Sequence, residues 1–310
     1  MNLVIWFNNP GGGHGISLLN TSLGVLKNLY GGVRIVGGIF PKEMKVTGIA
    51  VLDKEDLKTL NFDLILVVGD NAQGEAFFTG NDSKRESFFA SVLHEAEQLN
   101  LNTDKIIADR IVLVPNFTLE KYKKLRRSKL SILSMNCFAG LLYHRFALPF
   151  LSPTINMYTS EEDFLEFLKN PVENVRGEFN LVKTEFNDVL GFEYPVFKIC
   201  ESEWHMNHYK DFEMAKNKWR ERSQRINWFN TLVTMYTESY KVLAEFDKLP
   251  FAKKVCFVPF DTNLESGYYL DLTKMATPEL WRAVNGTATG EVPFYDMWDM
   301  LLYGKKTPLM

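Results

Sequence analysis

The sequence contains few cysteines and none of the short motifs that mark a metal or nucleotide site. Cysteine occurs three times in 310 residues, at Cys137, Cys200 and Cys256, without a CxxC pair. Such a sparse, odd set argues against a disulfide framework and structural zinc, and it is typical of a reducing compartment. P-loop, HExxH and nucleophile-elbow signatures are also missing. We therefore expect no metal ion and a cytoplasmic location.

Long apolar runs and an excess of charge of one sign are missing as well. No stretch approaches the roughly 20 apolar residues that span a bilayer, and the N-terminus has no basic segment followed by a cleavage site. The net charge of −3 gives no overall attraction to nucleic acid. A small molecule or a glycan is therefore the expected partner, with no nucleic acid and no transmembrane segment.

Aromatic residues are plentiful, at 14% of the chain with 24 Phe, which indicates dense cores or a surface that faces carbohydrate. The length favours two domains, and strand patterns alternate with helical patterns throughout. We predict two three-layer α/β domains: a Rossmann-like domain over residues 1–122, and a second over residues 123–310. The second has a mainly parallel sheet with a small antiparallel insertion near residues 180–209.

In the first domain the patterns predict the order strand, loop, helix, strand, strand, helix, strand. These segments are Leu3–Phe7, the loop 8–15, Ile16–Leu29, Val33–Phe40, Asp63–Gly69, Ser87–Leu99 and Ile106–Val114. Gly11, Gly13 and Gly15 in the loop are candidate cofactor-binding residues, because an open backbone can cradle a phosphate. The loop does not fit GxGxxG and no acidic residue follows the second strand, which counts against a nicotinamide cofactor. The loop is then interpreted either as a site for a sugar nucleotide or as a purely structural turn.

A basic run, Glu120–Lys129, marks the joint between the domains. It reads as a solvated helix face or as an electropositive rim for an acidic ligand. The strands expected beyond it are 130–134, a short one from Thr154, Asn180–Glu185, Tyr194–Cys200, Glu203–Tyr209, Thr231–Tyr236 and Lys254–Pro259. The expected helices are Glu161–Leu168, one capped by Asp211, Ser239–Leu249, Pro278–Val284 and Phe294–Tyr303.

The main candidate site is the corner where the apolar run 130–134 turns into a helix. Cys137 falls in the first turn of that helix, where unpaired backbone N–H groups and the helix dipole favour a thiolate. The corner also lies at the carboxyl end of a strand, where ligands bind in α/β sheets. Cys137 with His208, or with His205, is a candidate nucleophile–base pair. The alternative is a small buried residue at a tight turn, which is how Cys200 and Cys256 are best interpreted within their apolar strands.

Polar residues expected at the same sheet edge are candidates for substrate binding. Hydroxyl and amide groups that suit a hydroxyl-rich ligand are at Ser134, Asn136, Ser152, Thr154 and Asn156. Near the end of the helix after Asp211, the further candidates for substrate binding are Arg222, Arg225 and Asn227. Arg222 and Arg225 could bind a phosphate, with Arg225 as the anion clamp.

The motif around the corner resembles a bacterial family labelled exopolysaccharide biosynthesis proteins. The residues that carry the resemblance are 134–144, 148–156, His208-Tyr209, Ala215, Trp219, Arg222, Arg225-Ile226-Asn227 and Phe246–Pro250. The resemblance covers roughly residues 125–260 and implies a role in capsule or exopolysaccharide synthesis. The resemblance does not imply a particular reaction.

These observations lead to three functional hypotheses. The first is a transferase that moves an acyl or glycosyl-type group to or from a nucleotide-linked or lipid-linked sugar, with a sugar nucleotide or CoA as donor. In it Cys137 is the nucleophile or a group on the oxyanion side, and His208 is the base. The second is a non-catalytic protein that binds a sugar nucleotide or acts as a scaffold, and the third is a nicotinamide-dependent sugar oxidoreductase.

Overall fold

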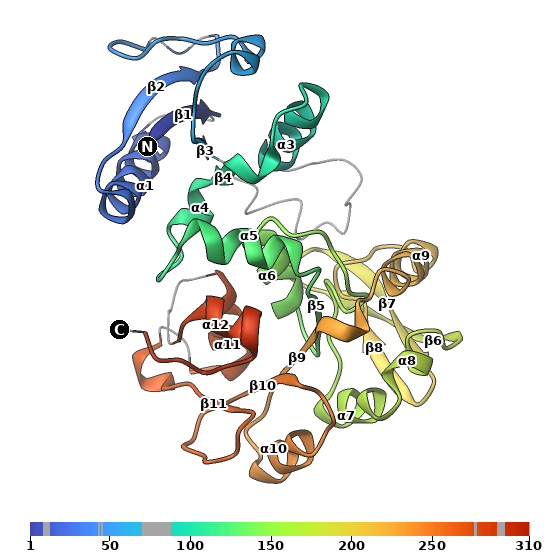
Figure 1. The fold of residues 1–310 in the computed structure, drawn as a ribbon. Coiled ribbons are helices and arrows are strands. Elements are labelled where there is room, and N and C mark those ends of the chain that lie inside the picture. The colour runs from blue at the N-terminus through green and yellow to red at the C-terminus, as the bar shows by residue number, and fades with distance from the viewer. Residues whose placement is uncertain are drawn as a thin grey trace. The chain divides into compact units, whose positions relative to one another are not determined.

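A computed structural model describes residues 1–8, 13–42, 44, 46–69, 88–275, 278–289 and 295–309. It has two compact units, one comprising the described residues up to Lys123 and the other those from Lys124 onward. Each unit holds a parallel sheet with helices, and the second also has a small antiparallel sheet (Figure 1). The predicted α/β fold class is confirmed. Within the described part of the chain, every helix is too short or too polar to cross a membrane.

The first unit is built on a four-stranded parallel sheet in the order β2-β1-β3-β4. Its strands are β1 (Asn2–Phe7), β2 (Arg34–Ile39), β3 (Leu64–Val68) and β4 (Ile106–Ala108), and its longer helices are α1 (Gly13–Tyr30) and α3 (Phe88–Gln98). The strand β3 is a continuous apolar run with all five residues buried, as expected for a parallel strand covered on both faces. The chain crosses from β2 over β1 to β3, which places a topological switch point between β1 and β3.

The expectation that Ile106–Val114 continues as a strand is wrong beyond Ala108. A short helix, α4 (Asp109–Val112), begins there instead. Its first residue, Asp109, is buried and accepts hydrogen bonds from the N–H groups of Gly69 (2.9 Å) and Arg110 (2.6 Å). A carboxylate at the first turn satisfies otherwise unpaired N–H groups and thereby starts a helix.

The second unit contains a parallel sheet in the order β11-β10-β9-β5. Its strands are β5 (Ser131–Ser134), β9 (Thr231–Tyr236), β10 (Lys253–Val258) and β11 (Gly267–Tyr269). The helices are α5 (Leu119–Arg127) at the joint, then α6 (Phe138–Arg145), α7 (Glu161–Lys169), α8 (Pro171–Asn174), α9 (Phe212–Ser223), α10 (Tyr240–Asp247), α11 (Leu280–Thr289) and α12 (Met297–Tyr303).

Helices cover both faces of this sheet because alternate strand residues point to opposite sides. Leu133, Val233 and Cys256 join one core cluster with residues of α7, α9 and α10. Phe257, with the opposite parity, packs against Phe138 of α6 with ring centroids 5.1 Å apart. The sheet is therefore a middle layer between two layers of helices.

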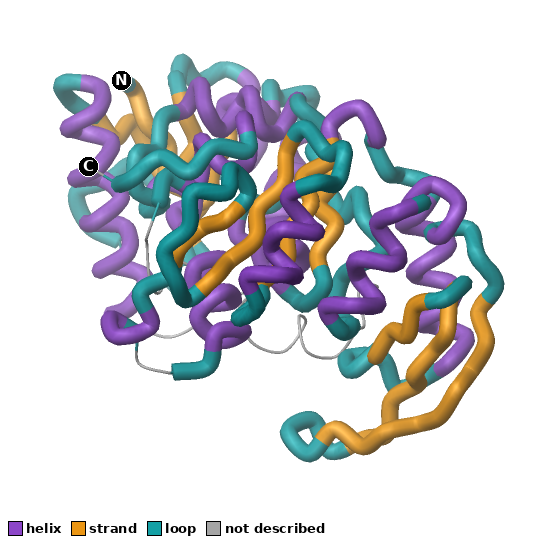
Figure 2. Tube along the Cα trace, turned by 90° about the horizontal axis from the view of Figure 1, so that it is seen from below, coloured by secondary structure: helices purple, strands orange, loops and turns teal. Residues whose placement is uncertain are grey.

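An antiparallel sheet in the order β6-β7-β8 is inserted between α8 and α9. Its strands are β6 (Phe179–Asn187), β7 (Phe192–Ile199) and β8 (Ser202–His205), and the β6–β7 hairpin projects from the unit (Figure 2). Aromatic side chains fix this sheet to the helices, with Trp204 contacting Phe167 and Trp219 at 5.1 and 5.2 Å between centroids. The abundant aromatic residues thus form a dense core.

Three local expectations in the second unit are wrong. No strand begins at Thr154, and only Tyr158 pairs with His205 in an isolated bridge. The strand expected to run to Tyr209 ends at His205, where a turn follows. Cys200 is exposed in the β7–β8 turn with φ of 51° rather than in the core, since the apolar pattern of β7 ends one residue earlier at Ile199. Cys256 is buried as expected.

Candidate functional site

The candidate site begins where β5 passes into α6. Asn136 organises this turn through its side-chain oxygen, which accepts hydrogen bonds from the Ser134 hydroxyl (3.0 Å) and the Phe138 N–H (3.1 Å). Its amide nitrogen donates to Asn285 of α11 at 3.3 Å, a residue that the sequence did not single out. With Asn136 fixed in this way, Cys137 occupies the position just before the helix. The buried Asn136 side chain therefore holds the turn that positions the Cys137 thiol.

The predicted partner of Cys137 lies next to it. The Sγ atom of Cys137 and the Nε2 atom of His208 are 3.5 Å apart. Because β8 ends at His205, residues 206–209 form a turn, closed by a hydrogen bond from Tyr209 N–H to the Met206 carbonyl (2.8 Å). This turn directs His208 toward the corner. His208 is buried, whereas Cys137 is partly exposed.

Burial decides the protonation state of the thiol. It raises the pKa of Cys137 to about 12, against a smaller lowering by the backbone at Met157. The expectation that the helix N-terminus favours a thiolate is therefore outweighed by desolvation. Burial also raises the pKa of Tyr209, and that of Tyr236 to about 12, with the negative charge of an ionised Cys137 adding to both. Cys137 is a neutral thiol at physiological pH and needs a base to react.

The hydroxyl residues near the corner do meet, but as internal supports. Thr154 Oγ1 accepts a hydrogen bond from the Ser134 N–H (3.0 Å) and lies 3.1 Å from the Ser152 hydroxyl. Ser152, Thr154 and Asn156 are all buried, and Asn156 has φ of 61°. These predicted substrate-binding residues are thus buried inside the unit, and the contacts of Ser152 and Thr154 anchor the loop 152–156 to the end of β5.

Of the two arginines predicted to bind an anion, Arg222 lies inside the second unit. Arg222 is buried and reaches the site through Tyr209, whose hydroxyl accepts its hydrogen bond (2.7 Å), while its guanidinium lies over the Phe150 ring. Burial, with a further contribution from Arg225, lowers the pKa of Arg222 to about 10. It supports the wall of the site and is not a solvent-facing clamp.

Arg225 and Asn227 are not brought to the Cys137 corner. Arg225 forms an ion pair with Glu221, and the Asn227 N–H donates to the Ser131 hydroxyl (2.8 Å). Ser131 is the first residue of β5, so this contact lies at the amino end of the strand and Cys137 follows its carboxyl end. Both residues precede β9 in the chain, and β9 runs parallel to β5. They therefore lie toward the amino ends of these strands and not at the carboxyl ends, where Cys137 lies.

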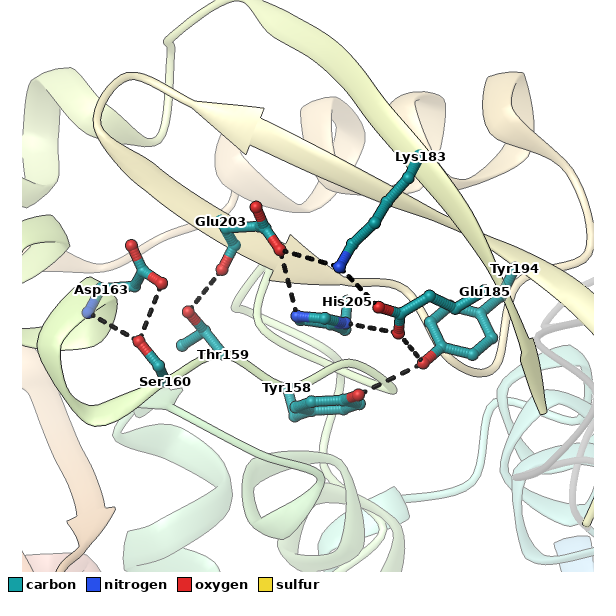
Figure 3. A network of polar contacts seen from close by, with 9 residues as sticks. All are labelled: Tyr158, Thr159, Ser160, Asp163, Lys183, Glu185, Tyr194, Glu203 and His205. Carbon is teal, nitrogen blue, oxygen red and sulfur yellow. Dashed lines mark hydrogen bonds and ion pairs between the residues drawn. The ribbon is translucent and has the colours of Figure 1, made fainter. Parts of the chain in front are cut away.

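A second polar cluster, the His205 network, consists of His205, Tyr158, Lys183, Glu185, Tyr194 and Glu203 (Figure 3). His205 Nδ1 lies 3.0 Å from the Glu185 carboxylate and its Nε2 lies 3.5 Å from Glu203. Its ring stacks on Tyr158, with centroids 4.5 Å apart and planes 11° from parallel. The Tyr158 hydroxyl is 3.2 Å from that of Tyr194, which donates to Glu185 at 2.6 Å.

Hydrogen bonds hold Glu185 in its charged form. Hydrogen bonds from Lys183 and Tyr194, with a smaller contribution from His205, lower the pKa of Glu185 to about 2 against the opposing effect of burial. Tyr158, Glu185 and Tyr194 had not been predicted, because they lie far apart in the sequence. The one available signal was that Lys183 and Glu185 share a face of the expected strand.

The His205 network and the corner are joined by two short chain segments. The backbone at Met157 contacts the Cys137 thiol, and the next residue is Tyr158. On the other segment, His205 and His208 are three residues apart, a span of at most about 11 Å. Both features therefore belong to one end of the second unit.

The glycine loop of the first unit lies partly outside the described residues, and Gly11 is among those not described. Gly13 begins α1 and Gly15 lies in its first turn. A Cβ atom at Gly15 would come within 2.8 Å of the Phe7 ring, so this glycine permits close packing of α1 on β1. Across the described ranges, no three His, Cys, Asp or Glu side chains are grouped to hold a metal ion.

Fold and site define an α/β protein with a cysteine–histidine pair at the carboxyl edge of a parallel sheet. The family model described as "Domain of unknown function (DUF1919)" matches residues 109–303, and the chain belongs to this family. An uncharacterised protein of Haemophilus influenzae is 32% identical over 160 residues, which make up 50% of this chain and 73% of that protein. The Cys137 corner and the His205 network both fall within the family match.

Proposed function

We propose that the second unit is an acyl-transferring enzyme in which Cys137 is the nucleophile and His208 its base. The single observation that carries this proposal is the 3.5 Å contact between Cys137 Sγ and His208 Nε2 at the carboxyl edge of the sheet. A partly exposed thiol beside a buried imidazole is the arrangement that nucleophilic catalysis requires. The high pKa of the thiol makes the base necessary, as it is for a serine hydroxyl.

The reaction proceeds in two steps. Cys137 Sγ attacks the carbonyl carbon of the acyl donor, a C–S bond to Cys137 forms, and the bond between that carbon and the leaving group, the CoA sulfur for an acyl-CoA donor, breaks. The thiol proton passes to His208 Nε2, which returns it to the leaving group. The N–H groups of Ala139 and Gly140, in the first turn of α6, have no acceptor within the helix and suit the developing oxyanion. In the second step a hydroxyl group of the acceptor attacks the thioester, a C–O bond forms, the C–S bond breaks, and the hydroxyl proton returns to the sulfur by way of His208.

A sugar that is nucleotide-linked or lipid-linked is the proposed acceptor. The His205 network supports this choice, because an aromatic ring beside carboxylates offers both a stacking surface and hydrogen-bond acceptors for sugar hydroxyls. Tyr158 retains about a third of its surface, with a relative exposure of 36%. The resemblance of residues 134–156 to exopolysaccharide biosynthesis proteins points to the same class of acceptor.

The raised pKa of Cys137 favours a second candidate, a binding protein that recognises a sugar nucleotide without turnover. In that case the thiol is a packing residue at a tight turn, and its contact with His208 has no catalytic consequence. The two candidates predict different responses to donors.

A melting-temperature screen distinguishes them. The purified chain is tested with acyl-CoA, free CoA, UDP- and GDP-sugars and NAD(P), where a ligand at 100 times its Kd adds about 2.7 kcal/mol. The acyl-transfer proposal expects stabilisation by acyl-CoA and loss of the acyl group from it over time. Stabilisation by a sugar nucleotide alone, without turnover, supports the binding protein.

A further inference from the structure

A fully exposed phenylalanine lies at the amino-terminal edge of the β5–β9 sheet. Phe229 has a relative accessibility of 104%, the highest among the exposed large apolar residues of the described chain. It sits in a single 3-10 turn, Trp228–Asn230, between α9 and β9. Its neighbours Ile226 and Trp228 pack against the core cluster. Phe229 is thus turned outward, while Ile226 and Trp228 are partly buried against the core.

Side-chain hydrogen bonds hold this turn in place. Asn227 Nδ2 donates to the Lys129 carbonyl (3.0 Å) and Asn230 Nδ2 to the Ser128 carbonyl (2.9 Å). Asn230 Oδ1 accepts from Lys253 Nζ at 2.8 Å. Two asparagine side chains therefore fix the segment that presents Phe229, so its exposure is built into the fold. This gives Asn227 a structural task in place of the predicted contact with substrate.

Basic residues lie at and near the turn. The backbone carbonyl of Lys129 and the Nζ atom of Lys253 contact it as described, and the Lys129 residue is exposed. Lys124 is also exposed, and its Nζ atom donates to the Tyr303 hydroxyl at 3.0 Å. Burial, and to a smaller extent the charge of Lys124, lower the pKa of Lys253, so these two positive charges are close enough to repel each other. Arg225 adds a guanidinium that is ion-paired with Glu221. An anionic partner would relieve this repulsion.

We propose that the Phe229 surface, formed by Phe229, Lys124, Lys129, Lys253 and Arg225, docks on an anionic phospholipid bilayer. The Phe229 ring enters the headgroup region and the basic side chains face the lipid phosphates. An exposed aromatic residue among lysines is the combination that binds such surfaces, since apolar insertion and electrostatic attraction act together. Because the chain has a net charge of −3, the attraction to anionic lipid must come from the basic residues of this surface and not from the protein as a whole. The proposal does not depend on the acyl-transfer reaction.

Vesicle co-sedimentation tests this surface directly. The full chain is mixed with phosphatidylcholine vesicles, with and without phosphatidylglycerol, at low and at high salt. We expect binding only when phosphatidylglycerol is present and release in 1 M salt, where the screening length falls to about 3 Å. Phe229→Ala should weaken binding by about tenfold or more. Because the side chain is fully exposed, this variant should melt like the wild type.

Matched variants separate this surface from general charge effects. Lys129→Asn should weaken binding about fivefold, and asparagine tolerates the φ of 47° at this position. Val189→Ala removes another highly exposed apolar residue, in the β6–β7 loop (91%), and should leave binding unchanged. Absence of binding at low salt, or equal binding by Phe229→Ala, overturns the proposal. Binding of a short DNA duplex that is equally sensitive to Phe229→Ala would also overturn it and assign the surface to nucleic acid.

Discussion

Raising the pH should increase the reactivity of Cys137 toward iodoacetamide over a wider range than for an ordinary thiol. Burial raises the pKa of Cys137 to about 12, whereas a thiol in water has a pKa of about 8.5. This difference lowers the thiolate fraction near pH 7 by about three orders of magnitude. The thiolate is the form that reacts, so alkylation should be slower by a similar factor.

The assay follows alkylation of the Cys137 peptide by mass spectrometry between pH 7 and 10, with a short cysteine peptide that has blocked termini in the same tube. The rate at Cys137 should rise about tenfold per pH unit up to pH 10, while that of the reference thiol should level off above its pKa of about 8.5. The slope distinguishes protonation from restricted access, because access changes the rate by a constant factor. A plateau between pH 8 and 9, or a fast reaction at pH 7, would refute the reasoning and show a stabilised thiolate.

Three further predictions concern stability. The pKa of Glu185 is lowered to about 2, mainly by Lys183. The charged carboxylate therefore stabilises the fold above the unfolded pKa of about 4.3, and this stabilisation is lost as the pH falls toward 2. Urea unfolding of Glu185→Gln should depend less on pH in this window, and an unchanged profile would contradict the role of this carboxylate. Asn136→Ala should destabilise the second unit by about 1–2 kcal/mol in urea unfolding, because the buried side-chain hydrogen bonds to Ser134 and Phe138 are lost; stability equal to the wild type would show that these hydrogen bonds are dispensable. Gly304→Ala should lower the melting temperature, because φ is 67° and a Cβ atom would lie 3.1 Å from the Lys253 backbone; an unchanged melting temperature would mean that this turn adapts freely.

Local patterns in the sequence predicted much of the fold. The strand at Thr231–Tyr236 has the bounds that its apolar pattern indicated. Ser160 caps α7 by accepting a hydrogen bond from the Asp163 N–H at 3.1 Å. Such features depend on neighbouring residues only, and this is why they can be read from one sequence.

The candidate site was harder to predict because its parts come from distant segments. The choice between His205 and His208 depended on where β8 ends, and the apolar alternation continues past that point. Tyr158 and His205 meet through a single bridge, whose register no local pattern specifies. Burial of Cys137, which outweighs the helix dipole, follows from packing of the loop 152–157 and the turn 206–209 around it.

The most direct test of the central claim is to trap an acyl group on Cys137. Rapid mixing with p-nitrophenyl acetate should release a stoichiometric burst of p-nitrophenolate and leave a hydroxylamine-sensitive acetyl group on the Cys137 peptide. The burst should vanish in Cys137→Ala, slow by about 100-fold or more in His208→Gln, and persist in Cys200→Asn, which removes the exposed thiol. A burst that survives in Cys137→Ala, or an acetyl group carried by Cys200 instead, would contradict the assignment of Cys137 as the nucleophile.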